Sequence, residues 1–270
     1  MEDTEQPQSG ANLHHSTRRG FLIKTSAVAF SASVIGSESA AAHEIEQYTI
    51  RDGTPEQTTV YVTEANRSGP TVFVIGGQHG DEPSGWMAAN EIAQWQPDTG
   101  KLVVIPEADQ TAIRDRTYTG DNGNLNRSWT IGSDPTRLLA REIWDVVEEH
   151  DPDVFFDLHS SFGIYGSDWG PDGVGQAVHP TPHDYAPRLA SAAATYINRN
   201  FIPDNYRNEY NFQRGPFSAG DIPTFTGKVA VDLEKPGFTV ESTRYEVPLD
   251  RRVTWTRRVV TDVLRHRDVI

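Results

Sequence analysis

The 270-residue sequence contains no cysteine, and this absence excludes several kinds of chemistry. Disulfide bonds, zinc–thiolate sites, thiol catalysis and a lipid anchor on cysteine all require that residue. The sequence also lacks any run of 18 or more apolar residues, so we expect neither a membrane-spanning helix nor a stable membrane anchor. Hydrophobic residues still make up 36% of the chain, which is typical of a globular protein and too high for a disordered one.

Basic residues are in the minority, with 24 Lys and Arg against 38 Asp and Glu and a net charge of −14. An acidic field repels phosphate groups, and no basic run interrupts it, so we expect no nucleic-acid partner. Only four of the basic residues are lysines, at positions 24, 101, 228 and 235. An acidic, lysine-poor surface is expected of a protein kept soluble in concentrated salt, and an ordinary acidic enzyme is the alternative explanation.

Residues 1–42 have the three-part layout of an export signal. The basic segment S-T-R-R-G-F-L-I-K is followed by a modest apolar stretch, 27–36, and by a run of small residues that ends at Ala42. The pair Arg18-Arg19 resembles the twin-arginine type of signal, which carries folded proteins across the membrane. We therefore expect the twin-arginine export machinery as a partner, cleavage near Ala42, and an exported domain over residues 43–270.

Within that domain, patterns typical of strands alternate with patterns typical of helices. β-Branched and apolar runs predict strands over 59–63, 71–76, 101–106, 154–158, 228–233 and 238–240. Helical spacing predicts helices over 82–95, 134–150, 186–198 and 249–266. This alternation indicates an α/β layer fold with a mixed or largely parallel sheet. The Gly-, Pro- and Asp-rich loop over 163–182 is long enough to form a lid or a pocket wall.

One strand ends in a pattern that suits metal binding. In T-V-F-V-I-G-G-Q-H-G-D-E-P-S, His79 and Glu82 follow the strand directly and stand where a helix begins. The His-x-x-Glu spacing alone is a weak signal, because His43 and Glu46 share it with no strand before them. The position of His79 and Glu82 makes them the better candidates, since open α/β sheets bind ligands at the carboxyl ends of their strands.

A third metal ligand is expected from another strand end, and His159 closes the apolar strand 154–158. Two histidines and one carboxylate leave a coordination position free for water, which is the catalytic zinc arrangement. Imidazole ligands also favour zinc over magnesium or calcium. Asp157 is expected to point to the opposite sheet face, and we do not count it as a ligand.

Three segments together resemble a known family. The segments G-G-Q-H-G-D-E-P-S-G, N-L-N-R at 124–127 and D-L-H-S at 157–160 look like the succinylglutamate desuccinylase/aspartoacylase family, which is related to the zinc carboxypeptidases. The likeness runs in order from about residue 70 to about residue 245. It implies a three-layer α/β/α fold with a central mixed, largely parallel sheet, and one zinc ion per chain held by the residues that match the family's ligands. These are His79, Glu82 and His159.

The segment around N-L-N-R supplies arginines that could hold a substrate carboxylate and polarise a scissile carbonyl. Asn126 and Arg127 match the family's carboxylate clamp. The family's upstream arginine most resembles Arg116, and Arg114 is the alternative. An ordinary surface ion pair is the competing explanation for any one of these arginines. The sequence departs from the family after Arg127, where S-W-T-I-G replaces Phe-Pro-Gly, so we expect a different pocket wall there and with it a different substrate.

A zinc hydrolase needs a general base that takes a proton from water and passes it to the leaving nitrogen. Glu241, in F-T-V-E, looks most like the family's catalytic glutamate. Glu234 is the fallback, and its ordinary role would be that of a strand-end charge paired with Lys235. Tyr165 and Tyr245 are candidates for a tyrosine that closes over the substrate. The chain is short for a full aspartoacylase, so no added carboxy-terminal β domain is expected.

These observations favour an exported zinc-dependent hydrolase that cleaves an amide bond in a small carboxylate-bearing substrate, such as an N-acyl amino acid. The close alternative is a metallocarboxypeptidase that acts on peptides, and the predicted export supports it, because peptides are the commoner extracellular substrate. A zinc-containing binding module without catalysis is the alternative from another class, and it would retain the metal ligands while lacking the base or the arginines.

Overall fold

The computed structural model describes residues 44–220 and 222–270, and the predicted export signal lies outside them. One eight-stranded sheet forms the centre of the structure, in the order β1-β2-β4-β3-β5-β8-β6-β7. The strands are β1 (Ile45–Ile50), β2 (Thr58–Glu64), β3 (Thr71–Gly76), β4 (Lys101–Ile105), β5 (Val154–Ser161), β6 (Ala177–Pro180), β7 (Gln213–Arg214) and β8 (Gly237–Thr243). The central strands β4, β3, β5 and β8 run parallel, and antiparallel pairs flank them. The sheet is therefore mixed and parallel in the middle, as predicted.

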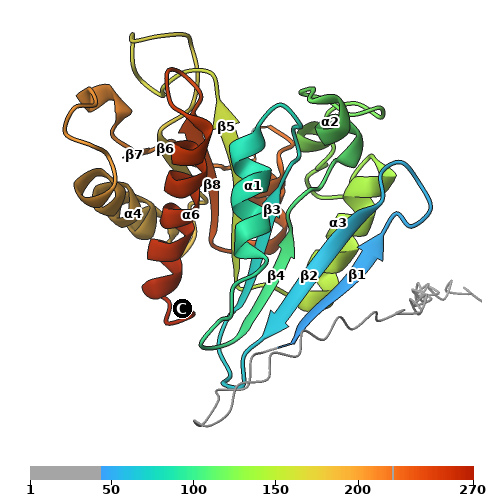
Figure 1. The fold of residues 1–270 in the computed structure, drawn as a ribbon. Coiled ribbons are helices and arrows are strands. Elements are labelled where there is room, and N and C mark those ends of the chain that lie inside the picture. The colour runs from blue at the N-terminus through green and yellow to red at the C-terminus, as the bar shows by residue number, and fades with distance from the viewer. Residues whose placement is uncertain (1–43, 221) are drawn as a thin grey trace, which may run out of the picture.

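Helices cover both faces of this sheet, which makes three layers (Figure 1). The α-helices are α1 (Pro83–Ile92), α2 (Gln110–Asp115), α3 (Leu138–His150), α4 (Ala186–Asn200), α5 (Phe225–Lys228) and α6 (Leu249–Arg265). Shorter helical turns are η1 (Leu125–Arg127), η2 (Asn208–Tyr210) and η3 (Val229–Leu233). None of the described helices is long and apolar enough to cross a membrane.

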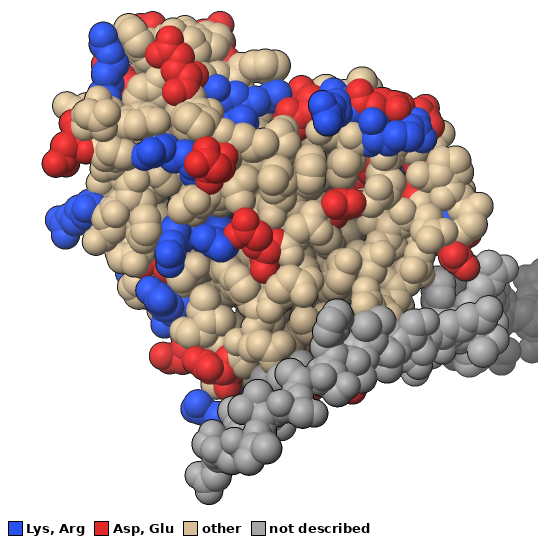
Figure 2. Space-filling model, in the orientation of Figure 1, with Lys and Arg blue, Asp and Glu red and all other residues tan. Residues whose placement is uncertain are grey.

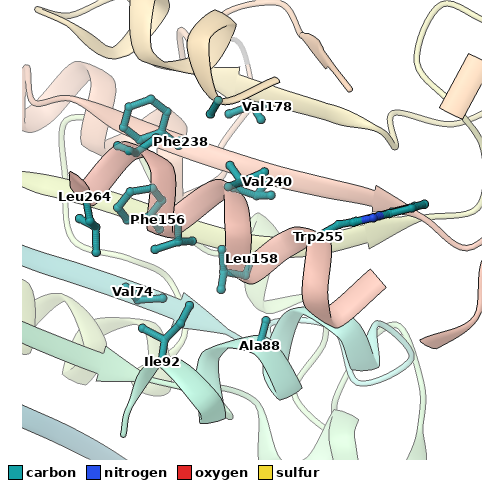
Figure 3. Packing of buried hydrophobic residues seen from close by; sticks show 14 of the residues in the cluster. Val74, Ala88, Ile92, Phe156, Leu158, Val178, Phe238, Val240, Trp255 and Leu264 are labelled. Atoms are coloured by element: carbon teal, nitrogen blue, oxygen red, sulfur yellow. The ribbon is translucent and has the colours of Figure 1, made fainter. Parts of the chain in front are cut away.

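Two apolar clusters, one on each side of the sheet, hold the layers together. Strand β5 contributes to both because its side chains alternate: Phe156 and Leu158 pack with α1, α4 and α6, whereas Phe155 packs with α3 and α5. Figure 3 shows Ala88 of α1 and Leu264 of α6 directed at the sheet face that carries Phe156 and Leu158. Even residues of β5 are thus buried under α1 and α6, and odd residues face the opposite side.

The outer surface over α1 and α6 carries charges of both signs. In Figure 2, Lys and Arg side chains are interspersed with Asp and Glu on this face, and neither sign forms one continuous patch.

The predicted helix over 134–150 begins later than expected, at Leu138. The segment before it follows η1 in turns, which are held by backbone hydrogen bonds such as that from the Thr136 N–H to the Ser128 carbonyl.

The strand predicted over 228–233 is wrong, since this segment completes α5 and forms the helical turn η3. The Thr224 side chain caps α5 by accepting a hydrogen bond from the Gly227 backbone N–H at 3.1 Å. Lys228 is buried, and its Nζ donates to the Thr130 and Ser133 carbonyls at 2.8 Å. A helix cap and a buried cation therefore outweigh the β-propensity of the Val-rich run.

Helix α1 packs unusually close to β5, and this approach brings two halves of the sequence together. A Cβ atom at Gly85 would lie 2.2 Å from the Leu158 carbonyl oxygen, so only glycine fits there. The close approach places the residue before α1, Glu82, beside the end of β5, where His159 is found.

Gly85→Ala is expected to push α1 away from β5. Overpacking of this kind costs about 1–3 kcal/mol in free energy of unfolding, which corresponds to a melting temperature several degrees lower. Thermal unfolding followed by circular dichroism measures the loss. An unchanged melting temperature would show that α1 and β5 separate without cost and would contradict this explanation of the glycine.

Candidate metal centre

The turn after β3 depends on a second steric requirement. A Cβ atom at Gly80 would lie 1.9 Å from the Ala112 carbonyl oxygen, and the Gly80 N–H donates to the Thr117 carbonyl at 2.9 Å. The turn ends at Glu82, which immediately precedes Pro83 at the first position of α1. The segment H-G-D-E-P-S-G therefore has glycines where the backbone is crowded and a proline where a helix starts.

The three predicted ligands converge on one point. The Nδ1 atom of His79 lies 3.0 Å from Oε1 of Glu82, and the Nδ1 atom of His159 lies 2.8 Å from Oε2 of the same carboxylate. One donor atom from each residue lies within 4.8 Å of the others, and all three side chains are buried. Two imidazoles and one carboxylate, contributed by two strands and a helix start, can share a single cation.

Outer hydrogen bonds orient both imidazoles. Nε2 of His79 lies 3.2 Å from Oδ1 of Asn124, and Nε2 of His159 lies 2.9 Å from Oδ1 of Asp157. An N–H donated from Nε2 to these oxygens leaves the Nδ1 lone pair of each ring free for a metal. The expectation that Asp157 points to the opposite sheet face is wrong, because residues two apart on a strand share a face.

Asp157 is itself held by a buried chain of hydrogen bonds. Nε2 of Gln78 donates to Oδ1 of Asp157 at 2.7 Å, and Oε1 of Gln78 accepts from the indole N–H of Trp129, also at 2.7 Å. Trp129 belongs to the S-W-T-I-G segment in which the sequence departs from the family pattern. Trp129 therefore supports the candidate metal ligand His159 through Gln78 and Asp157, a role that sequence reasoning missed.

Asp157→Asn is expected to weaken metal binding by about 10- to 100-fold, because the carboxylate that fixes His159 loses its charge. Competition with a chelator of known affinity measures the change. Asp153→Asn is the matched control, since that carboxylate lies before β5, at the far end from His159, where it accepts a hydrogen bond from the Thr71 backbone N–H. Equal metal affinities in the two variants would contradict the role assigned to Asp157.

The charges at the centre suit a cation. Burial favours the neutral form of Glu82, but the imidazoles of His159 and His79 outweigh it and hold its pKa well below the usual range. Burial disfavours a charged His159, yet the carboxylates of Asp157 and Glu82 raise its pKa well above the usual value. Two buried carboxylates thus favour a positive charge at His159, and a bound divalent cation would supply that charge in place of the proton. The donor set and the local charge therefore fit zinc.

Glu241 stands next to this centre on the neighbouring strand. It pairs in register with His159 across β5 and β8, so the two side chains share a sheet face. Burial, reinforced by the charges of Glu82 and Asp157 and opposed by His159, raises the pKa of Glu241 to about 8. Its Oε2 atom is buried and has no hydrogen-bond partner in the described structure, so one oxygen is free to meet a ligand.

A cavity of about 640 Å³ opens above these residues. Asn126, Arg127 and Glu241 line it together with the three metal-ligand candidates. Asn126 is buried, accepts a hydrogen bond from the Phe225 N–H at 3.1 Å, and places its Nδ2 atom 3.2 Å from Nε2 of His159. The structure therefore brings together six of the seven predicted site residues.

The other predicted residues lie elsewhere. Arg116 is exposed, ends α2 in the left-handed region and is not among the residues that line the cavity. Arg114 forms surface ion pairs with Asp115 and Asp121. Glu234 is exposed at the left-handed end of η3, away from the cavity lining, and Lys235 pairs with Asp151 instead. The geometry adds no support to a catalytic role for Arg116, which stays a prediction.

A second cavity arginine comes from a position that sequence reasoning missed. Nη1 of Arg244 donates to Oδ2 of Asp81 at 3.0 Å, and Nη2 lies 3.8 Å from Oε1 of Glu82. Its guanidinium carbon stands 3.9 Å from the centre of the Phe162 ring. The available signal was a basic residue three positions after Glu241, at the carboxyl end of a predicted strand.

The loop predicted as a pocket wall does contribute to the cavity, through Val174 and His179, although part of it forms β6. The cavity tyrosine is Tyr118, whose ring centre lies 3.9 Å from that of His79. Neither Tyr165 nor Tyr245 is among the lining residues.

Comparison with known proteins places this arrangement in context. No family model matches the sequence. Over 100 residues the chain is 34% identical to N-alpha-acetyl-L-2,4-diaminobutyric acid deacetylase of Halomonas elongata, a match that covers 34% of this chain and only 29% of that protein.

Solved structures match over a longer part of the chain. Tripeptide-bound Csd4 of Helicobacter pylori superposes with a TM-score of 0.64 at 17% identity, covering 78% of this chain and 55% of that one. A succinylglutamate desuccinylase/aspartoacylase of Rhodobacter sphaeroides gives 0.55 at 21% identity, covering 79% and 60%. Product-bound EutE of Ruegeria pomeroyi gives 0.57 at 19% identity, covering 84% and 67%. The chain therefore has the fold that succinylglutamate desuccinylase/aspartoacylase proteins share with the D,L-carboxypeptidase Csd4, which confirms the resemblance indicated by its motifs.

Proposed function

We propose that this protein is a zinc-dependent amide hydrolase that acts on a small carboxylate-bearing substrate of the N-acyl amino acid type. The observation that carries the proposal is the convergence of His79, Glu82 and His159 at a cavity that Glu241 also enters. A protein similar in sequence is named as a deacetylase, and proteins with a similar fold are named as desuccinylases and a carboxypeptidase, which supports hydrolysis of an amide bond.

The three convergent residues would hold one zinc ion per chain. When bound there, zinc lowers the pKa of water towards about 7 and polarises a carbonyl oxygen. Asp157 and Asn124 keep the two histidines in the orientation that such binding needs.

The remaining cavity residues would handle protons and orientation. Glu241 has a free carboxylate oxygen on the sheet face of His159, and it would accept a proton from water and deliver it to the leaving nitrogen. Arg127 and the Asn126 amide would orient the substrate carboxylate. Arg244, held between Asp81 and Phe162, is the cavity guanidinium nearest to Glu82. It is therefore better placed than Arg116 to polarise the scissile carbonyl.

The test combines metal analysis with a substrate panel. The purified domain should contain one zinc per chain and should release free amino acid from N-acyl amino acids faster than from short peptides. Absence of stoichiometric zinc from protein purified without chelator would overturn the proposal. One bound zinc with no hydrolysis of either substrate class would favour a non-catalytic binding module.

Peptide hydrolysis is the second candidate because the tripeptide-bound Csd4 structure superposes over 78% of this chain. Release of the carboxy-terminal residue from short peptides, at a higher kcat/KM than deacylation, would favour a metallocarboxypeptidase.

We also propose that the protein is exported through a twin-arginine-type signal at residues 1–42 and works in concentrated salt. The order of basic, apolar and small-residue segments in the sequence supports export, and the acidic composition supports the salt preference. Amino-terminal sequencing of secreted protein should find a start near residue 43. Secretion that persists after Arg18 and Arg19 are both replaced by lysine would contradict the twin-arginine assignment.

A further inference from the structure

Exposed apolar side chains are concentrated around the candidate site. Seven large hydrophobic residues are exposed in the described part of the chain, and five of them line the cavity. The five, here called the apolar rim, are Tyr118, Phe162, Val174, Phe217 and Ile222. Apolar side chains left open to water at one place mark a binding surface rather than a defect of packing.

The apolar rim is assembled from loops that are distant in sequence. Tyr118 follows α2, Phe162 and Val174 lie between β5 and β6, and Phe217 and Ile222 lie between β7 and α5. The Tyr118 ring contacts that of His79, so the rim begins directly beside the metal ligands. A substrate side chain attached close to the scissile bond would therefore contact the apolar rim.

The charges inside the cavity limit how many carboxylates a substrate can present. Arg244 already shares its charge with two carboxylates of the protein, because its guanidinium bonds to that of Asp81 and lies 3.8 Å from that of Glu82. Arg127 donates to the Asn126 carbonyl oxygen at 2.7 Å and has no carboxylate within 4.0 Å among the described residues. Among the described residues, Arg127 is thus the cavity arginine without a carboxylate partner, which suits a substrate with one carboxylate.

From the apolar rim and Arg127 we infer that the substrate is the N-acyl derivative of an amino acid with a bulky apolar side chain and one carboxylate. The inference rests on the proposed function and narrows its substrate class. A charged side chain would lose hydration against the rim, which costs binding free energy. A cationic side chain would also meet the guanidinium groups of Arg244 and Arg214, which stand over the Phe162 and Phe217 rings. An acidic side chain would have to compete with Asp81 for Arg244. An apolar side chain would gain by leaving water.

Three substrates that differ only in side chain test the inference: the N-acetyl derivatives of L-phenylalanine, L-aspartate and L-2,4-diaminobutyrate. We expect kcat/KM for the phenylalanine derivative to exceed that for the other two by about tenfold or more. Phe217→Ala and Ile222→Ala should each reduce this preference severalfold. Leu138→Ala is the matched control, since Leu138 is 56% exposed at the start of α3 and outside the cavity lining. A preference for the aspartate or diaminobutyrate derivative, or one that the rim variants leave unchanged, would overturn the inference.

Binding measurements separate this inference from the proposed function. Titration calorimetry of the metal-free protein with N-acetyl-L-phenylalanine and N-acetyl-L-aspartate should show tighter binding of the former, and Phe217→Ala should remove the difference. Selective binding without any hydrolysis would defeat the proposed function and leave the apolar specificity standing. Hydrolysis with equal or tighter binding of the aspartate derivative would defeat the inference and leave the hydrolase standing.

Discussion

Replacing Glu241 by glutamine should remove most of the turnover while leaving the metal content unchanged. The glutamine side chain has nearly the same shape, so the packing of β8 against β5 is preserved, but its neutral amide cannot act as a base. Loss of a positioned general base typically costs about 10²- to 10⁴-fold in rate. Steady-state hydrolysis of an N-acyl amino acid, with zinc measured on the same sample, gives both quantities.

Glu234→Gln is the matched control for this experiment. Glu234 lies in the same sequence region but is exposed at the end of η3, away from the cavity lining, so its removal should leave kcat and metal content unchanged. A fully active Glu241→Gln enzyme would refute the assignment of the base. An inactive Glu234→Gln enzyme would transfer the role to the fallback residue and would require a different arrangement of the segment between α5 and β8.

Glu82→Ala is expected to abolish stoichiometric metal binding and, with it, hydrolysis. The two oxygens of Glu82 lie 3.0 and 2.8 Å from the Nδ1 atoms of His79 and His159, so one substitution removes the group that both imidazoles face. Changing a residue that only supports a ligand already weakens metal affinity by about 10- to 100-fold, and a direct ligand should cost more. Metal analysis after dialysis measures the loss.

A thermal readout adds a test that does not depend on activity. A metal that binds only the folded state stabilises it by about 4 kcal/mol when present at a thousand times its Kd. Chelation should therefore lower the melting temperature of the wild-type protein and leave that of Glu82→Ala unchanged. Glu46→Ala is the control, because this exposed residue of β1 shares the His-x-x-Glu spacing without the site. One zinc per chain in Glu82→Ala would contradict the metal assignment.

Sequence patterns predicted best those site residues that lie at the ends of strands. His79 and Glu82 are three residues apart on one turn, so local geometry alone brings them close. His159 lies near the carboxyl end of a strand that is buried on both faces, and the parallel pairing of β3 with β5 carries that strand end to the same edge of the sheet. Asp157 could also have been placed, because the two-residue period of a strand puts it on the face of His159.

Other features depended on contacts between segments far apart in the chain. The run over 228–233 has strand-like composition, yet a buried Lys228 that bonds to carbonyls about 95 residues away makes it helical. Arg116 and Arg244 could not be ranked from the sequence, since an arginine's direction in a loop depends on its partners. Arg244 is held by Asp81, 163 residues earlier, whereas Arg116 stands in a left-handed turn that directs the chain along the surface.

The sequence by itself determined the layered α/β architecture and the candidate metal-ligand trio, because periodicity and spacing act over a few residues and parallel strands end at one edge. The choice of Glu241 as candidate base came from its likeness to the family's catalytic glutamate. Only the tertiary structure decided which arginine enters the cavity, which hydrogen bonds orient the histidines, and that the cavity is rimmed by apolar side chains. Those features are set where loops meet, and the packing of distant segments, rather than local propensity, determines how side chains point there.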